Sequence, residues 1–451
     1  MPAIPRVARD LSVVGLDIGT SLIKVVEMRS VRGAIQLLNV GIRPTPPEVI
    51  SNGVVVDAQT LAAAIRGLLA NQAIRTRAVI SSVAGQSSLV VRPIEVPKMT
   101  RAELDDTMRW EVERHIPFAA SEVIMDYQPL VEPEELPESQ QNMEVLLAVA
   151  QEDMINAHIE TLQSAGLEPR ALDIEPLAAC RALVDIDAES GAYDRTIALI
   201  NMGASTTDIS IIRKGLLSFS RPIPLAGDSI TSAIAEALGT DEAEAERLKK
   251  EFAGAPSAGA PAGEPAAIAP APRPLEQQVE AVRPLEPEAE EEGQRPVFDL
   301  SAELEDQMPA ARAPQAPQSA LPTEPAAPEP TEPEATAPPA AQPGQTQQAQ
   351  RVRQAIMPTL GEMVGEIRRS LEYFHTRYPE DRVDRVLLFG GTARMPDLAA
   401  FLGNELGMNV EIGDPAGRLS ALPAHLSPGY MREIGCLLPV AIGLGLREML
   451  E

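Results

Sequence analysis

The sequence predicts a soluble α/β protein, and two patterns carry that prediction. Apolar, strand-like runs alternate with amphipathic helical segments through most of the 451 residues. Strands also end in three glycine-bearing turns, at residues 17–21, 201–206 and 389–392. Because glycine lets backbone N–H groups approach an anion closely, these turns indicate phosphate or nucleotide chemistry.

Composition excludes several classes of protein. A formal net charge of −27 argues against bulk binding to nucleic acid or to an anionic membrane surface. The two cysteines, Cys180 and Cys436, predict neither a metal cluster nor a disulfide framework, and the four histidines lack paired metal-ligand spacing. No apolar signal segment and no run of about 18 apolar residues is visible. We therefore expect a cytoplasmic protein without direct membrane insertion.

The first half of the chain opens with three consecutive strands and continues with a mixed region. The expected strands are 11–19, 21–29, 34–43, 77–84, 87–97, 121–131 and 143–151, and the expected helices are 101–117 and 152–167. Trp110 lies on the first of these helices, where an aromatic residue more often packs into a core than onto a partner. We therefore expect Trp110 to be buried.

The second half repeats the pattern of strands and a glycine turn. A strand–turn–strand meander is expected over 196–223, amphipathic helices over 228–253 and 352–378, and a strand, a Gly-Gly turn and a helix over 384–407. The apolar run 437–446 is short and lacks a basic face, so it predicts a buried core helix.

A compositional break separates the two long helices of the second half. Between residues 251 and 350 lie 20 of the 42 prolines, with 17 acids against 4 bases. Such a segment buries too little apolar area to offset its ordering entropy, so disorder is expected over 253–350. It could serve as a tether or docking arm, but a tolerated surface insertion is the simpler interpretation. The island 295–308 has helical apolar spacing and is a candidate docking segment.

The residues at the turns indicate what the phosphate chemistry requires. An acid beside such a turn would repel phosphate, so Asp17 and Asp208 suggest a bridging cation such as Mg²⁺. Thr20 and Ser21 add hydroxyl donors, and Lys24 on the return strand can reach a phosphate as a point charge.

The order of motifs resembles the actin/DnaK-type ATPase superfamily. The segments that carry the resemblance are "DIGTSLIK", "DIEPLAACRAL", "NMGASTTDISII", "EAERLKK" and "FGGTARMPDL". The resemblance implies duplicated, actin-like (ribonuclease H-like) α/β domains that close over ATP or ADP with Mg²⁺. Two of these segments resemble the phosphate hairpins, and the others resemble a connecting helix, a ribose-contacting helix and the adenosine motif.

Carried over residue by residue, the resemblance assigns candidate roles. Asp17 and Asp208 would hold the metal through waters, and Glu175 would orient the attacking water, so that Glu175 and Asp208 are the catalytic candidates. The candidate nucleotide-binding residues are Asp17, Gly19, Thr20, Ser21, Lys24, Gly203, Ala204, Ser205, Thr206, Glu246, Lys249, Gly390, Gly391, Thr392 and Met395.

Within the superfamily, residues 95–130 resemble the PilM family of cytoplasmic actin-like proteins in type IV pilus assembly, which is related to FtsA. That resemblance implies a scaffold held at the inner membrane by PilN, a bitopic membrane protein. The cytoplasmic N-terminal peptide of PilN would lie in a groove between a small inserted α+β subdomain and its neighbour. Contacts with the pilus assembly complex and its motor ATPase, and self-association, stay open.

The expected domain organisation follows from these assignments. The ranges are 1–11, a disordered N-terminus; 12–41 and 166–194, the two halves of domain I; 42–165, the inserted partner-binding subdomain; 195–252 and 351–451, the two parts of domain II; and 253–350, the disordered insertion.

One departure from the superfamily bears on catalysis. The second hairpin begins with Asn201 where an aspartate is usual, and Ala204 and Ser205 replace glycines. An amide attracts Mg²⁺ less than a carboxylate, and added Cβ atoms restrict the approach of the backbone to phosphate. We expect nucleotide binding with slow or negligible hydrolysis, because turnover depends on placing water and metal to a fraction of an ångström.

Two other functions remain open. An FtsA-like filament-forming division protein needs a basic amphipathic helix for the membrane, and the sequence lacks one after 437–446. A small-molecule kinase on the same fold needs a carboxylate base, for which Asp173, Glu175 and Asp185 are candidates by position.

Overall fold

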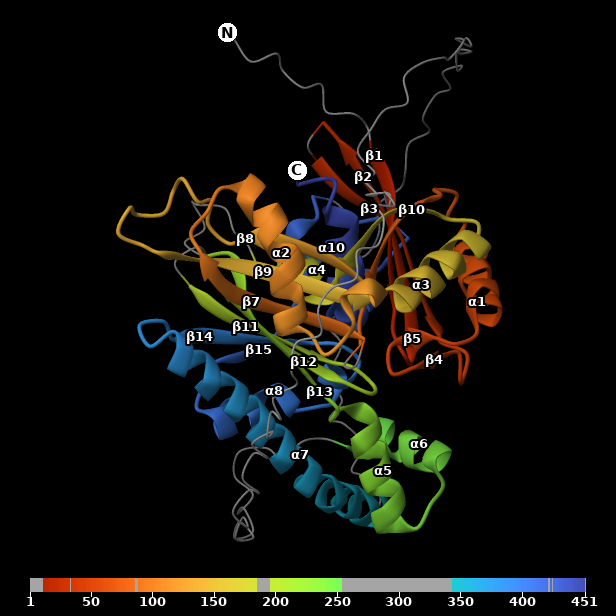
Figure 1. Cartoon of the computed structure of the whole chain (residues 1–451). Helices are drawn as coiled ribbons and strands as arrows, with labels where there is room; N and C mark the ends of the chain where they lie inside the picture. The colour runs from red at the N-terminus through yellow and green to blue at the C-terminus, as the bar shows by residue number, and fades with distance from the viewer. Residues whose placement is uncertain are drawn as a thin grey trace, which may run out of the picture. The chain divides into compact units, whose positions relative to one another are not determined.

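The computed structural model describes residues 11–32, 34–85, 88–184, 195–253, 343–420, 422–423 and 425–450 (Figure 1). The predicted docking segment 295–308 and the kinase candidate Asp185 lie outside these residues.

The first sheet has five strands in the order β10-β6-β1-β2-β3. Its members are β1 (Leu11–Ile18), β2 (Leu22–Val31), β3 (Ala34–Pro44), β6 (Ala78–Val83) and β10 (Glu168–Ile174). Strand β2 pairs antiparallel with both β1 and β3, whereas β6 runs parallel to both β1 and β10. Helices α1 (Ala58–Asn71) and α3 (Glu152–Ser164) contribute to one hydrophobic cluster with this sheet, and the short strands β4 (Ile50–Ser51) and β5 (Val54–Val55) pair beside them.

The second sheet repeats the arrangement of the first. Its order is β13-β12-β11-β14-β15, with β11 (Thr196–Met202), β12 (Thr207–Arg213), β13 (Leu216–Ile223), β14 (Val383–Phe389) and β15 (Val410–Ile412). An antiparallel meander is again followed by parallel strands on the other side of its first strand. The duplicated α/β architecture expected from the sequence is therefore present.

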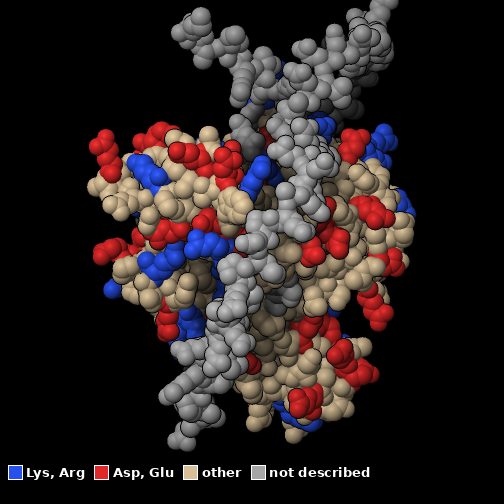
Figure 2. All heavy atoms as spheres, viewed as in Figure 1, with Lys and Arg blue, Asp and Glu red and all other residues tan. Residues whose placement is uncertain are grey.

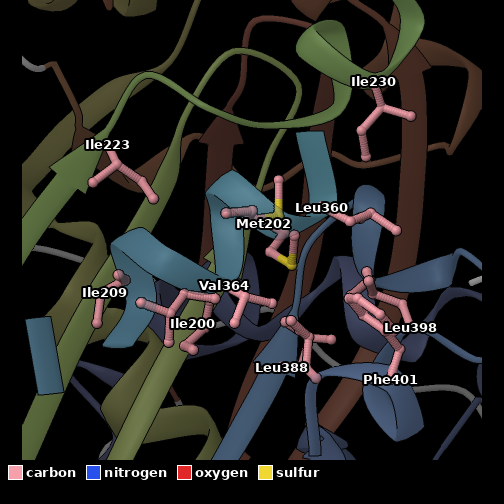
Figure 3. Close-up of a cluster of buried hydrophobic side chains, with 14 of the residues drawn as sticks. Ile200, Met202, Ile209, Ile223, Ile230, Leu360, Val364, Leu388, Leu398 and Phe401 are labelled. Carbon is pink, nitrogen blue, oxygen red and sulfur yellow. The ribbon is translucent and has the colours of Figure 1, made fainter. Parts of the chain in front are cut away.

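Helices from the second half cover one face of the second sheet. They are α5 (Gly227–Leu238), α6 (Glu242–Phe252), α7 (Pro343–Arg377) and α8 (Leu398–Leu406). Their apolar side chains meet those of β11, β12 and β14 in one buried cluster, in which Ile200, Met202, Val364 and Phe401 lie close together (Figure 3).

Two helices lie between the sheets. Helix α4 (Glu175–Leu183) and helix α10 (Pro439–Leu446) pack against each other, and their side chains share a cluster with residues of both sheets. Every residue of α10 is buried, which confirms the core helix expected at 437–446. The chain reaches α10 through η4 (Pro415–Arg418), α9 (Pro428–Ile434) and η5 (Gly435–Leu437).

No single helix among the described residues has the length and apolar character needed to cross a membrane. Within the described part of the chain, the pair Pro428–Leu437 and Pro439–Leu446 meets that criterion when taken together, and the two helices are bent by 88°.

A smaller third sheet is not joined to the other two by strand pairing. It has the order β7-β9-β8, with β7 (Leu89–Pro97), β8 (Val123–Pro129) and β9 (Asn142–Gln151), and helix α2 (Arg101–His115) packs on one face (Figure 1). The expected subdomain 42–165 was broader than this sheet, because α1, β6 and α3 belong with the first sheet.

The prediction that Trp110 is buried is wrong, because its side chain is 73% exposed. Leu104 and Met108, four residues apart, form the buried stripe of α2. Since successive helix residues rotate by about 100°, position 110 falls on the far side of that stripe.

Two helix boundaries also differ from expectation. The segment 228–253 forms two helices, because Gly239 ends α5 in a left-handed conformation and Asp241 caps α6 by accepting from the Glu244 N–H at 2.8 Å. Helix α7 begins at Pro343, so residues 343–350 are helical rather than part of the predicted disordered insertion.

Candidate nucleotide site

The two glycine hairpins have the same local geometry. In the first, Gly19 N donates to Leu22 O at 3.0 Å, and in the second, Gly203 N donates to Thr206 O at 2.9 Å. The strand registers place Asp17 opposite Lys24 and Asn201 opposite Asp208. The paired positions are therefore occupied by an acid and a lysine in the first hairpin, and by an amide and an acid in the second.

The tips of the two hairpins meet. Thr20 Oγ1 lies 3.2 Å from Ser205 Oγ, although 185 positions separate them in sequence, and both side chains are exposed. The sequence prediction required Gly19 and Gly203 to face one cleft, and this contact brings the two turns together.

Lys24 and Asp17 form an ion pair in the first hairpin. Lys24 Nζ lies 2.7 Å from Asp17 Oδ2, and Asp17 is 3% exposed. Lys24 therefore points at the acid of its own hairpin, so a cation that binds Asp17 would release the lysine for an anion.

A carboxylate from the connecting helix joins this group. Glu175 is the first residue of α4, and its Oε2 accepts from Asn201 Nδ2 at 3.0 Å. A small cavity is lined by Glu175, Asn201 and Asp208. The amide that departs from the superfamily pattern thus orients the predicted catalytic carboxylate.

Two carboxyl groups of this cluster have raised pKa values. Desolvation, together with the nearby Asp17 and Asp208 carboxylates, raises the pKa of Glu175 to about 8. Desolvation raises the pKa of Asp208 to about 6, against a weaker opposing hydrogen bond from Thr206. Lys24 offsets the effect of the two acids on Glu175 only in part, so a bound cation would further stabilise the charged form of Glu175.

The carboxylates of Asp17 and Asp208 fit an Mg²⁺ ion that keeps part of its hydration shell. Mg²⁺ usually keeps several waters and takes one or two carboxylates plus substrate phosphates. Among the described residues, no group of three or more His, Cys, Asp and Glu side chains is arranged as a complete metal site. Asp17 and Asp208 would therefore hold the ion together with water and a phosphate.

The segments predicted to hold the nucleoside contact the second hairpin. Thr392 Oγ1, from the turn after β14, donates to Gly203 O at 2.7 Å. Helix α5 begins beside the same turn, where Gly227 N donates to Gly203 O at 3.2 Å and Asp228 N donates to Ala204 O at 2.8 Å.

Lys249 and Glu246 on α6 lie at the start of α5. Lys249 Nζ donates to Gly227 O at 2.9 Å and to Thr231 Oγ1 at 2.7 Å, and it pairs with Glu246 Oε2 at 2.5 Å. Both predicted ribose-contacting residues therefore lie next to the second hairpin, which itself contacts the Thr392 turn.

The Gly-Gly turn requires its first glycine. Gly390 has φ +96°, and a Cβ there would lie 2.5 Å from Met202 O. Gly391, by contrast, faces open space. Met395 is partly buried and packs against the hydrophobic cluster of the second sheet.

Sequence reasoning missed Gly227 and Thr231, which link the hairpin to Lys249. A Cβ on Gly227 would lie 2.7 Å from Thr392 Oγ1 and 3.5 Å from Lys249 Nζ. The small residues of the stretch "AGDS", at the start of a helix, were the sequence feature that could have indicated this contact. Asp173, a kinase candidate, is held by Arg181 at 2.6 Å and is 7% exposed, which leaves Glu175 as the kinase candidate that lines the cavity among the described residues.

Comparison with known proteins decides the family. The profile described as "Type IV pilus assembly protein PilM" matches residues 15–257, more than half of the chain. The chain belongs to the PilM family. A profile of "Cell division protein FtsA" matches residues 198–435, which also contain the second hairpin.

A solved structure and two curated proteins extend this result. The structure of a "PilM-PilN type IV pilus biogenesis complex" is 26% identical, has a TM-score of 0.70, and the match covers 98% of this chain and 99% of that one. FtsA of Bacillus subtilis is 26% identical over 53% of this chain and 57% of its own, and FtsA of Pseudomonas aeruginosa is 30% identical over 56% and 63%. The chain thus spans less than two thirds of these FtsA proteins. The PilM family and the actin-like fold predicted from the sequence are confirmed.

Replacing Glu175 with Gln is expected to change how stability depends on pH. When unfolded, Glu175 titrates near 4.5, and when folded its pKa is about 8, so between these values the folded state binds the proton more tightly. The free energy of unfolding of the wild type therefore falls as pH rises through this window, and the neutral variant avoids that loss. We expect equal stability near pH 4.5 and a variant more stable by on the order of 1–3 kcal/mol at pH 8.5.

Urea denaturation of nucleotide-free protein in EDTA measures this effect. Glu113→Gln, at an exposed position of α2, is the matched control and should follow the wild type at every pH. A Glu175→Gln variant that is uniformly less stable would contradict the raised pKa.

Proposed function

We propose that this PilM-family protein is a nucleotide-binding scaffold of a type IV pilus or related inner-membrane assembly complex. The observation that carries the proposal is the meeting of the two hairpin tips, Thr20 and Ser205, beside the Asp17, Glu175 and Asp208 carboxylates. A phosphate tail bound against this contact would touch both hairpins, and a nucleoside would extend toward Lys249 and Thr392. When bound, Mg²⁺ would supply positive charge to the phosphate oxygens.

Hydrolysis is expected to be slow. Glu175 keeps its proton at neutral pH because its pKa is raised, so it accepts a proton from water poorly unless a cation restores its charge. Asn201 also occupies a hydrogen-bonding position on that carboxylate. In a single-turnover assay with labelled ATP and Mg²⁺, the protein should bind ATP yet convert it far more slowly than about 1 s⁻¹, the low end of enzyme turnover.

The matched variant for this assay is Asn201→Asp. It restores the usual superfamily acid and should alter the turnover rate while the nucleotide stays bound. Turnover of the wild type near 1 s⁻¹ would contradict slow hydrolysis, and absence of any ATP or ADP binding would contradict the proposed site.

The proposed localisation is cytoplasmic, at the inner membrane through a protein partner. The similar solved structure is a complex of PilM with PilN. We propose that a PilN-like bitopic protein offers its cytoplasmic N-terminal peptide to the part of this chain around the third sheet. The peptide would supply the membrane attachment.

Filament formation is the second candidate function, favoured by the FtsA match over residues 198–435. Reversible pelleting with ATP in a centrifuge would favour it over the scaffold.

A further inference from the structure

A groove lies away from the nucleotide site, where the third sheet meets the second. It has a volume of about 670 Å³ and is lined by parts of β7, β13 and α7, including Ile94, Phe219 and Tyr373. β7 is an edge strand of the third sheet, and β13 is an edge strand of the second. The two strands run close together, yet no backbone hydrogen bond joins them among the described residues. Each strand therefore presents an edge without a strand partner.

The groove is basic in an acidic protein. Among its described lining residues, Arg92, Arg221, Arg369 and Arg377 stand against the single acid Glu95. Figure 2 shows a band of Lys and Arg atoms at the left of the view, where β7 and α7 lie in Figure 1. The chain as a whole has a net charge of −27, so this concentration of arginines departs from the average surface.

Nearby acids neutralise Arg221 and Arg369 only in part, whereas Arg377 is paired with Glu144 at 3.1 Å. Glu366 is the counter-ion of both Arg221, at 3.0 Å, and Arg369. Arg221 and Arg369 are 43% and 58% exposed, so their guanidinium groups can accept further carboxylates. One carboxylate shared by two arginines leaves a local excess of positive charge.

The groove also offers an aromatic surface. Tyr373 is 61% exposed, and its ring centroid lies 5.8 Å from that of Phe219. An exposed tyrosine beside arginines is a typical anchor at protein interfaces.

We propose that this groove binds an extended acidic segment of a partner protein, with carboxylates on Arg221 and Arg369 and an apolar side chain on Tyr373 and Phe219. The charge complementarity selects an acidic occupant, and the unpaired edges of β7 and β13 suit an extended backbone. The groove shares no lining residue with the cavity at the proposed nucleotide site, and its acidic occupant would be a second ligand beside the PilN-like peptide.

The test uses the full chain and two fluorescein-labelled synthetic decapeptides. One alternates Glu with Leu and carries a central Phe, and the other has Gln in place of every Glu. Fluorescence anisotropy should show the Glu peptide binding about tenfold tighter or more than the Gln peptide, with the difference shrinking between about 50 and 200 mM salt. Arg369→Glu should weaken the Glu peptide by about tenfold or more, and Tyr373→Ala should weaken both peptides.

Arg101→Glu, an exposed arginine of the third-sheet helix, is the matched control and should leave the Glu peptide's affinity unchanged. Thermal melting should show whether each variant is folded. If Arg369→Glu does not fold, the milder Arg369→Gln replaces it in the binding assay. Equal affinity for the two peptides, or no effect of either Arg369 variant, would overturn the proposal. Competition between the Glu peptide and the N-terminal peptide of the PilN-like protein would overturn the claim that the two peptides bind at separate sites. If the protein bound the Glu peptide but no nucleotide, only the proposed function would be rejected.

Discussion

Asp17→Ala is expected to remove the Mg²⁺ dependence of nucleotide binding. In the wild type, Asp17 is 3% exposed and paired with Lys24 at 2.7 Å, so a cation at Asp17 both meets the phosphate and frees the lysine. Without the carboxylate the ion loses a ligand, while Lys24 is free whether or not the ion is present. Titration calorimetry should show Mg²⁺ tightening ATP binding in the wild type, and an affinity about 100-fold lower for the variant in Mg²⁺, equivalent to about one charged hydrogen bond.

The experiment separates the metal from the lysine. Without Mg²⁺, the variant should bind ATP at least as well as the wild type, because its Lys24 is not held by Asp17. Asp106→Ala, at an exposed position of α2, is the control and should match the wild type under both conditions. If Asp17→Ala kept the full Mg²⁺ effect, Asp17 would not be part of the metal site.

Gly443→Ala is expected to destabilise the fold severely. Gly443 lies on α10 where this helix crosses α4, and a Cβ there would lie 1.7 Å from Ala178 O and 2.4 Å from Ala178 C. Both neighbouring atoms are backbone, so the two helices between the sheets must separate to admit a methyl group. A loss of about 3 kcal/mol or more in the free energy of unfolding is expected, at the upper end of overpacking effects.

Urea denaturation of paired glycine variants measures this effect. Gly361 also lies inside a helix, α7, but a Cβ there would have no atom within 4 Å. Gly361→Ala should therefore be neutral or stabilising by about 0.5–1 kcal/mol, since alanine restricts the unfolded chain and favours helix. Equal behaviour of the two variants would show that α4 and α10 do not pack as described.

Local sequence was sufficient for the elements that depend on neighbouring residues. The three strands of each meander, the turns at Gly19 and Gly203, and the Gly-Gly turn after β14 are set by alternation and turn residues within about ten positions. The break between α5 and α6 is also local: Gly239 and Asp241 carried the stop and start signals, but the long amphipathic pattern outweighed them in the prediction.

Other assignments depend on packing between segments that are distant in the chain. The pattern of β6 predicted a strand, but only pairing with β1 shows that it belongs to the first sheet and not to the inserted subdomain. Likewise, Trp110 is as apolar as a core residue, and its exposure follows from which face of α2 meets the third sheet.

The two hairpins, their acids and the family resemblance could be predicted from residues that are close together in the chain. Three contacts could be found only from the folded chain: Asn201 holds Glu175, Gly227 links Lys249 to the second hairpin, and arginines of β13 and α7 gather beside β7. These contacts join elements far apart in the chain. Spacing within a segment carries no information about which other segment its outward side chains will meet.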